Sequence, residues 1–257
     1  MAHCLGAESL AAARISALPD SMFYIPSFIT SYEEEQILDK LPPNRWTVLS
    51  HRRLQAHPST LTANNTLLAA PLLPYLTTSP APIVERFEKL GIFKDTPHGT
   101  PNHCLVNEYR KGEGIMPHED GDAYAPVVAT VSLGGTVVLE VTPKPVWAEA
   151  RDEEKTDQQG EGLVAEKNGD QAKRRIVCEP RSLLITTRSA YTTTLHGIPP
   201  VEVDTNLGPE TVANWQLLGN AQQYELAGGK NERGTRVKYW VAVEDDGANF
   251  DKRTTEF

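Results

Sequence analysis

His118 and Asp120 stand one residue apart in the stretch NEYRKGEGIMPHEDGDAY (107–124), directly behind a glycine-containing bend. In an extended chain, side chains at positions i and i+2 share one face, so this imidazole and this carboxylate can converge on one metal ion. The later stretch LHGIPP supplies a third donor, His196. Two histidines and one carboxylate that leave open positions on an octahedral ion form the facial triad of non-haem Fe(II) oxygenases.

Spacing alone leaves two interpretations open, a metal site or a histidine and an aspartate in a surface turn. His-x-Asp is a common pair, and most histidines in proteins are surface or packed side chains. Histidines outside the motif are also available here, at His51, His57, His98 and His103.

The elements that must position these residues are short β-strands. From Asn102 onward, the runs HCLVNEY, APVVATVSLG, TVVLEVTP, RRIVCEP, RSLLITTR and AYTTTLHGI are rich in β-branched or aromatic residues and are bounded by Gly, Pro or Asp. Strands at this spacing favour a β-sandwich or barrel over βαβ units. We therefore predict a mainly β (α+β) fold whose core spans about 101–245, with a flexible polar insertion at about 148–174.

The N-terminal part is more varied. SMFYIPSFITSYEEEQILDKL predicts a short strand followed by a helix, with Ser31 and Glu34 at capping-box spacing. PPNRWTVLSHRRLQ predicts a strand that leads into an exposed loop. Residues 56–82 look irregular, and a short amphipathic helix is expected at 83–90. We expect one domain over 21–245, with tails at 1–20 and 246–257.

Composition narrows the function classes. The chain has 257 residues, 39% of them hydrophobic, and a formal net charge of −9, which argues against nucleic-acid binding by bulk electrostatics. Two local basic clusters, at 45–53 and 173–175, could bind nucleic acid or be solvated surface. The three cysteines include no CxxC pair, and no run of about 20 apolar residues is present. The first residues lack a continuous apolar stretch, so we do not expect a signal peptide. We expect a monomer in the cytoplasm and nucleus, without membrane attachment.

Taken together, these motifs resemble the AlkB family of Fe(II)/2-oxoglutarate-dependent dioxygenases, and within it the branch called AlkB homologue six. The likeness runs in order through FYIPSFIT, RWTVLSHRRLQ, NEYRKGEGIMPHEDGDAY, VSLGG, EPRSLLI, AYTTTLHGI and RGTRV. It implies a double-stranded β-helix, or jelly roll, preceded by N-terminal helices and a nucleotide-recognition lid at about 21–100.

The resemblance also implies ligands and roles. His118, Asp120 and His196 would bind Fe(II), and 2-oxoglutarate and O₂ would be consumed. The cosubstrate residues would be Asn107, Tyr109 and Arg236, because a buried arginine clamps the far carboxylate of the cosubstrate. The implied substrate is an alkylated base of DNA or RNA, which must be unstacked to react. Candidates for the substrate surface are Trp46, His51, Arg52, Arg53 and Tyr124, although for Trp46 we favour a position in the core.

The sequence departs from the family pattern after Arg236. Family members place a second arginine six residues later, whereas this chain has Ala242, and the tail to Phe257 is acidic and unlike the family. Three explanations are open: a weakened cosubstrate site, a substitute cation, or a mis-predicted gene end. The candidate substitutes are Lys238, Arg181 and Arg188. A protein or peptide hydroxylase, or a non-catalytic relic, therefore remains an alternative to nucleic-acid demethylation.

Overall fold

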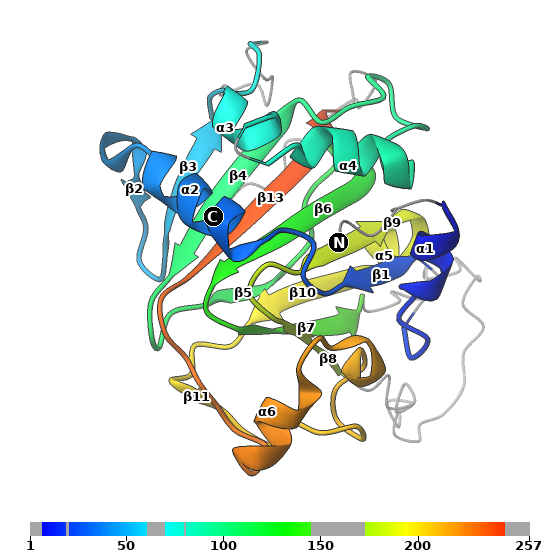
Figure 1. Ribbon diagram of the computed structural model, residues 1–257, viewed down its shortest axis with the longest axis vertical. Helices are drawn as coiled ribbons and strands as arrows, with labels where there is room; N and C mark the ends of the chain where they lie inside the picture. The colour runs from blue at the N-terminus through cyan, green and yellow to red at the C-terminus, as the bar shows by residue number, and fades with distance from the viewer. Residues whose placement is uncertain (1–6, 19–20, 61–69, 80, 145–172, 245–257) are drawn as a thin grey trace, which may run out of the picture.

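Two antiparallel sheets face each other in the computed structural model, which describes residues 7–18, 21–60, 70–79, 81–144 and 173–244 (Figure 1). The large sheet contains, in spatial order, β1 (Met22–Ile25), β9 (Leu183–Thr187), β6 (Tyr124–Gly134), β13 (Arg236–Glu244), β4 (His103–Tyr109), β3 (Arg53–His57) and β2 (Thr47–Val48). The small sheet contains β5 (Ile115–His118), β10 (Thr194–Ile198), β7 (Val137–Pro143) and β8 (Arg174–Cys178). This arrangement confirms the predicted jelly roll.

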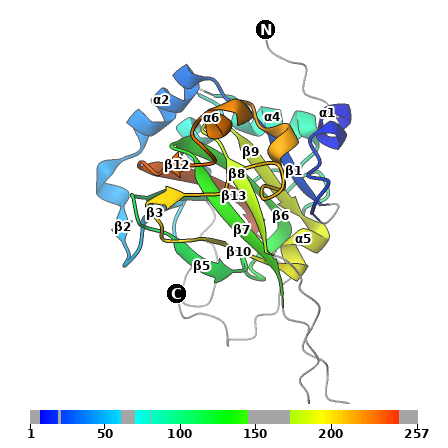
Figure 2. The same ribbon diagram turned by 90° about the horizontal axis from the view of Figure 1, so that it is seen from below.

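Helices cover the outer face of the large sheet, while the small sheet lies on its inner face (Figure 2). The covering helices are α2 (Ser31–Lys40), α3 (Pro74–Thr77) and α4 (Ile83–Leu90), the last with its predicted bounds. The remaining elements are the helices α1 (Ala7–Ala12), α5 (Arg188–Thr193) and α6 (Ala221–Leu226), the 3₁₀ turns Pro43–Arg45 and Trp215–Leu217, and the paired strands β11 (Val203–Asp204) and β12 (Asn231–Glu232). No described helix is long and apolar enough to cross a membrane.

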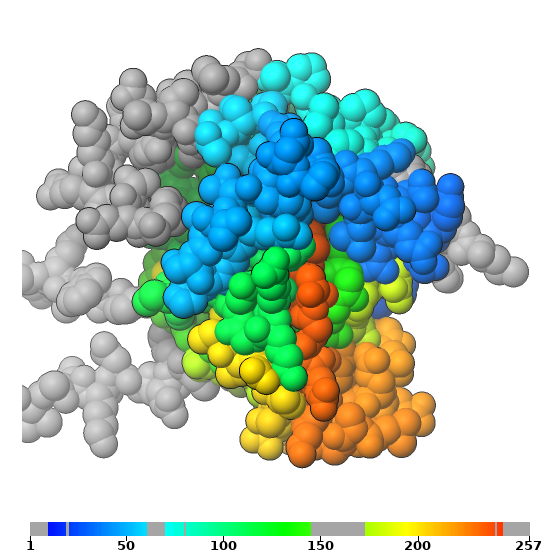
Figure 3. All heavy atoms as spheres, turned by 90° about the vertical axis from the view of Figure 1, so that its left-hand side faces the viewer, coloured from blue at the N-terminus to red at the C-terminus, as the bar shows by residue number. Residues whose placement is uncertain are grey.

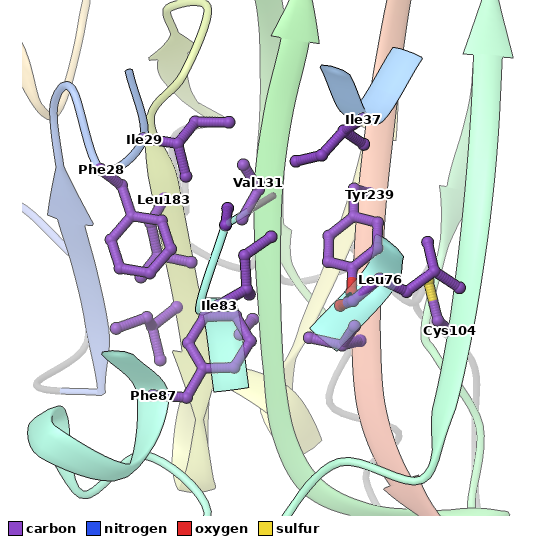
Figure 4. Packing of buried hydrophobic residues seen from close by; sticks show 14 of the residues in the cluster. Phe28, Ile29, Ile37, Leu76, Ile83, Phe87, Cys104, Val131, Leu183 and Tyr239 are labelled. Atoms are coloured by element: carbon purple, nitrogen blue, oxygen red, sulfur yellow. Dashed lines mark hydrogen bonds between the residues drawn. The ribbon is translucent and has the colours of Figure 1, made fainter. Parts of the chain in front are cut away.

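Strict alternation along the strands builds two cores. On the outer face, Tyr239 and Val131 pack with Phe28, Ile37 and other side chains under the helices (Figure 4). On the inner face, a second cluster fills the space between the sheets. Each fully buried large apolar side chain contributes about 1.5–3 kcal/mol. Because neighbouring strand residues point to opposite faces, each strand serves both cores.

Two local details differ from the sequence expectations. The capping box of α2 uses Thr30 and Glu33, one residue earlier than predicted, and Glu34 instead accepts the Gly134 N–H. The run predicted as one strand at 190–198 begins inside α5, because Thr193 and Thr194 donate their hydroxyls to carbonyls four residues back.

The segment predicted as an N-terminal tail is partly folded. It contains α1, and Ile15 is fully buried in the inner core. Most of the predicted insertion and all of the predicted C-terminal tail lie outside the described residues, since 145–172 and 245–257 are not described.

Candidate metal centre and cosubstrate site

Backbone pairing between β5 and β10 brings the three predicted metal ligands together. His118 and His196 are register partners, and their ring centroids are 4.5 Å apart. Asp120 follows β5 by two residues, and its Oδ1 lies 3.5 Å from His196 Nε2. One donor atom from each residue lies within 4.8 Å of the other two. This spacing fits one shared ion and leaves part of its coordination sphere to non-protein ligands.

A second contact orients the His118 ring. Its Nδ1 lies 2.8 Å from the Met116 carbonyl oxygen. Because a carbonyl can only accept, Nδ1 carries the proton and Nε2 keeps the lone pair that a metal needs. Burial, together with the neighbouring His196, lowers the pKa of His118. Burial and the charge of Lys238 lower the pKa of His196 to about 4. Both imidazoles are therefore neutral donors at neutral pH.

Two glycines allow β5 and β10 to approach this closely. A Cβ placed on Gly114 would lie 2.1 Å from the Ile198 carbonyl oxygen, and one on Gly197 would lie 2.9 Å from the Pro117 nitrogen. Any side chain at these positions must push the two strands apart. The glycines were visible in GEGIMPH and LHGI, but their role depends on the strand pairing.

Arg236 and Tyr109 lie side by side on the inner face of the large sheet. They are register partners on β13 and β4, and the guanidinium carbon of Arg236 is 5.7 Å from the Tyr109 ring centre. Burial raises the pKa of Tyr109 to about 12 and lowers the pKa of Arg236 to about 10. Arg236 nevertheless stays protonated at neutral pH, as a cation for a carboxylate must.

The hydrogen bonds of Arg236 show how it fits an anionic ligand. It is 1% exposed, and its Nη atoms donate to the carbonyls of Arg110 at 3.1 Å and Glu113 at 2.7 Å. Its buried Nε has no partner among the described residues. Carbonyls do not neutralise a guanidinium, so both a charge and a donor remain to be satisfied, which a dicarboxylate could do. The residues present therefore fit 2-oxoglutarate.

Asn107 and Arg52 extend this site toward the β2–β3 hairpin. Asn107 is two residues before Tyr109 on the same face of β4, and its Oδ1 accepts from Arg52 Nε at 3.1 Å. Figure 3 shows the hairpin, in light blue, bordering the green segment around 110 on one face of the molecule. His51 is exposed at the hairpin tip. Of the five predicted substrate residues, Arg52 and His51 thus lie on the hairpin that reaches the site.

Trp46 and Arg53 face the other way. Arg53 forms a bidentate pair with Glu108 at 2.7 Å for both bonds and lies 4.4 Å above the Trp46 ring. Glu108 lies between Asn107 and Tyr109 in sequence, so its side chain points to the opposite face of the sheet. Trp46 packs against the outer core, and both residues line a cleft of about 490 Å³ beside α2. The structure does not bring them to the triad.

Tyr124, the fifth predicted substrate residue, is buried. Its hydroxyl bonds His103 Nδ1 at 2.9 Å, and the two rings stack with centroids 5.4 Å apart. Ala242 is fully buried in the same small apolar cluster, so the position of the missing second arginine is filled by packing. A residue that sequence reasoning missed, Tyr191, donates to the Gly121 carbonyl at 2.7 Å and so holds the segment after Asp120.

Comparison with known proteins places these observations in context. Residues 21–237 match the profile of the 2OG-Fe(II) oxygenase superfamily. A Danio rerio protein named "Probable RNA/DNA demethylase ALKBH6" is 35% identical over 187 residues, which cover 72% of this chain and 71% of that protein. The Arabidopsis thaliana "Alkylated DNA repair protein ALKBH8 homolog" is 28% identical over 193 residues, and the aligned part is about half (52%) of its length.

A solved structure shows the same fold. "The structure of OsALKBH1" superposes with a TM-score of 0.52 at 14% identity, covering 88% of this chain and 98% of that one. At this identity the match concerns architecture alone.

Proposed function

This chain belongs to the 2OG-Fe(II) oxygenase superfamily and is a 2-oxoglutarate-dependent dioxygenase of the AlkB type, and from this premise we propose that it demethylates alkylated bases of RNA or DNA. The observation that carries the proposal is the 35% identity, over most of both chains, to a relative named as an RNA/DNA demethylase. The convergence of His118, Asp120 and His196 supports it, since it provides an Fe(II) site in the same chain.

The cofactors supply the oxidation. When bound at this site, Fe(II) with 2-oxoglutarate and O₂ would supply the oxidation of the N-methyl group to a hydroxymethyl group, with succinate and CO₂ as the other products. The hydroxymethyl product then loses formaldehyde and leaves the N–H of the repaired base.

The residues of the chain bind and orient the reactants. His118, Asp120 and His196 would hold the metal, and Arg236 would bind the far carboxylate of 2-oxoglutarate beside Tyr109. Arg52, which already contacts Asn107, would present its charge to a phosphate or a base at the entrance. An arginine here can make the charge-assisted bonds on which nucleic-acid affinity depends.

A turnover assay tests this function. Succinate and formaldehyde release would be measured with Fe(II), 2-oxoglutarate and O₂, in the presence of N-methylated RNA, N-methylated DNA or methylated peptide pools, with His118→Ala as the inactive control. We expect stoichiometric formaldehyde and succinate with a methylated oligonucleotide. Stimulation by peptides and not by either nucleic acid would refute the proposal in favour of a protein hydroxylase.

Location and assembly are part of the same proposal. We propose that the protein acts as a monomer in the cytoplasm and nucleus, where RNA and DNA are accessible. Imaging of the tagged full chain and light scattering of the purified protein test these two points.

A further inference from the structure

Lys238 is a buried cation without a counter-charge. It is 7% exposed and sits on β13 two residues after Arg236, so both side chains point to the inner face of the large sheet. Its Nζ lies 3.7 Å from Cys178 Sγ, and no described carboxylate lies within salt-bridge distance. A thiol is a weak acceptor, so this contact offsets little of the cost of burying an ammonium group. A lysine in such a position points to an anion that binds from outside the chain.

Two more polar atoms on the same face lack protein partners. Ser132 is the register partner of Lys238 on β6, and its buried Oγ has no hydrogen bond to any described residue. Arg236 Nε is unpaired in the same way. Buried donors are seldom left unsatisfied, because each costs about 1–3 kcal/mol. One donor with only a thiol as acceptor and two with none among the described residues lie on neighbouring positions of two adjacent strands and form a built anion site.

The other candidate cations are engaged elsewhere. Arg181 donates to Glu34 of α2 at 2.8 Å, and the side chain of Arg188 is 82% exposed beside Asp95. At the position of the family's second arginine, Ala242 packs in an apolar cluster. Among the three candidate substitutes, Lys238 is therefore the one that shares the inner face of the large sheet with Arg236.

We propose that Lys238, with Ser132, binds the far carboxylate of 2-oxoglutarate together with Arg236. This inference rests on the proposed dioxygenase function. The near carboxylate and the 2-oxo group would be taken up by the metal, so the far carboxylate is the part of the dianion that would need protein cations. Side chains two residues apart on a strand start about 7 Å apart, and both Arg and Lys are long enough to meet at one carboxylate.

The experiment compares two 2-oxo acids. Anaerobic titrations would follow the visible charge-transfer absorption of the Fe(II) chelate with 2-oxoglutarate and with 2-oxovalerate, which has the same chelating atoms but no far carboxylate. The variants are Lys238→Met, Lys238→Arg and Ser132→Ala, with Arg53→Met on the opposite face of the sheet as the matched control.

We expect Lys238→Met to weaken 2-oxoglutarate binding by about 10- to 100-fold, the range for a lost charge-assisted contact, with 2-oxovalerate affinity unchanged. Lys238→Arg should recover most of the loss, and Ser132→Ala should lose a few-fold for 2-oxoglutarate alone. The ligand-free melting temperature should not fall in Lys238→Met, because a buried unpaired charge has been removed.

Two results would overturn the inference. Unchanged 2-oxoglutarate affinity in Lys238→Met would show that the lysine does not contact the dianion. Equal weakening of both 2-oxo acids would show that it acts through the metal or the fold. If Lys238→Met does not fold, Lys238→Arg and Ser132→Ala give the same discrimination. No nucleic acid enters these titrations, so a failure of the demethylation proposal would be seen separately.

Discussion

Replacing Gly114 with alanine should weaken metal binding, although Gly114 is not itself a candidate ligand. The added Cβ would lie 2.1 Å from the Ile198 carbonyl oxygen, whereas ordinary contacts begin at 3.4 Å. Both atoms belong to or border the strands that carry His118 and His196, so relief requires the strands to separate by about 1.3 Å. Metal sites tolerate ligand shifts of only about 0.2 Å. We expect the affinity for a divalent metal to fall by about 10- to 100-fold, as it does when supporting contacts around metal ligands are lost.

The assay is anaerobic titration with Mn(II) or Co(II), accompanied by thermal unfolding of the ligand-free protein. Gly208→Ala is the matched control, because a Cβ there meets nothing within 4 Å and its backbone needs no left-handed conformation. The variant should lose both metal affinity and thermal stability, and the control should lose neither. Wild-type metal affinity in Gly114→Ala would refute the argument that the spacing of these two strands sets the spacing of the ligands.

Three further predictions follow from other contacts. Arg236→Ala should raise the dissociation constant of 2-oxoglutarate by about 100-fold. It should raise the dissociation constant of the metal by less, since only the bend at 110–114 loses its anchor; equal losses of affinity in the two titrations would contradict this division. Arg52→Met should lower oligonucleotide-stimulated turnover, whereas Arg53→Met should lower stability without affecting turnover at saturating substrate. Loss of turnover in Arg53→Met but not in Arg52→Met would contradict the assignment of Arg52 to the substrate side of the hairpin. Burial and Arg45 lower the pKa of His57 from 6.5 to about 4, so the unfolded chain takes up a proton that the folded chain resists, and stability should fall by up to about 3 kcal/mol as pH drops from about 6.5 toward 4. Chemical unfolding of wild type and His57→Gln across this pH range should show a smaller pH dependence in the variant.

Much of the fold was readable from sequence because strand signals are local. The run HCLVNEY became β4 with the expected bounds, and the helix at 83–90 was found from its apolar face. The three candidate metal ligands could be named from sequence, since a His-x-Asp pair within a stretch that resembles the family, together with a later histidine, predicts them. Their convergence, however, depends on β5 pairing with β10 across a long separation in the chain.

Features that depend on the register between paired strands could not be predicted from the sequence. Arg52 and Arg53 are neighbours of identical type, and only the pairing of Arg53 with Glu108 assigns them to different faces. A shift of one residue would exchange them. The capping residue of α2 and the helical turn before β10 were missed for a related reason: Ser, Thr and Glu side chains at adjacent positions offer similar local hydrogen bonds, and tertiary partners select among them.

The bonds from Arg236 to the bend carbonyls of Arg110 and Glu113 have a consequence for the order in which ligands stabilise one another. The bend leads directly into β5, which ends at His118. An anion that binds the Arg236 guanidinium therefore also affects the position of the strand that carries a candidate metal ligand. Thermodynamic reciprocity then requires that the cosubstrate strengthen iron binding by the same free energy by which iron strengthens cosubstrate binding. When iron is scarce, the fraction of this protein that keeps its iron would therefore rise and fall with the concentration of 2-oxoglutarate.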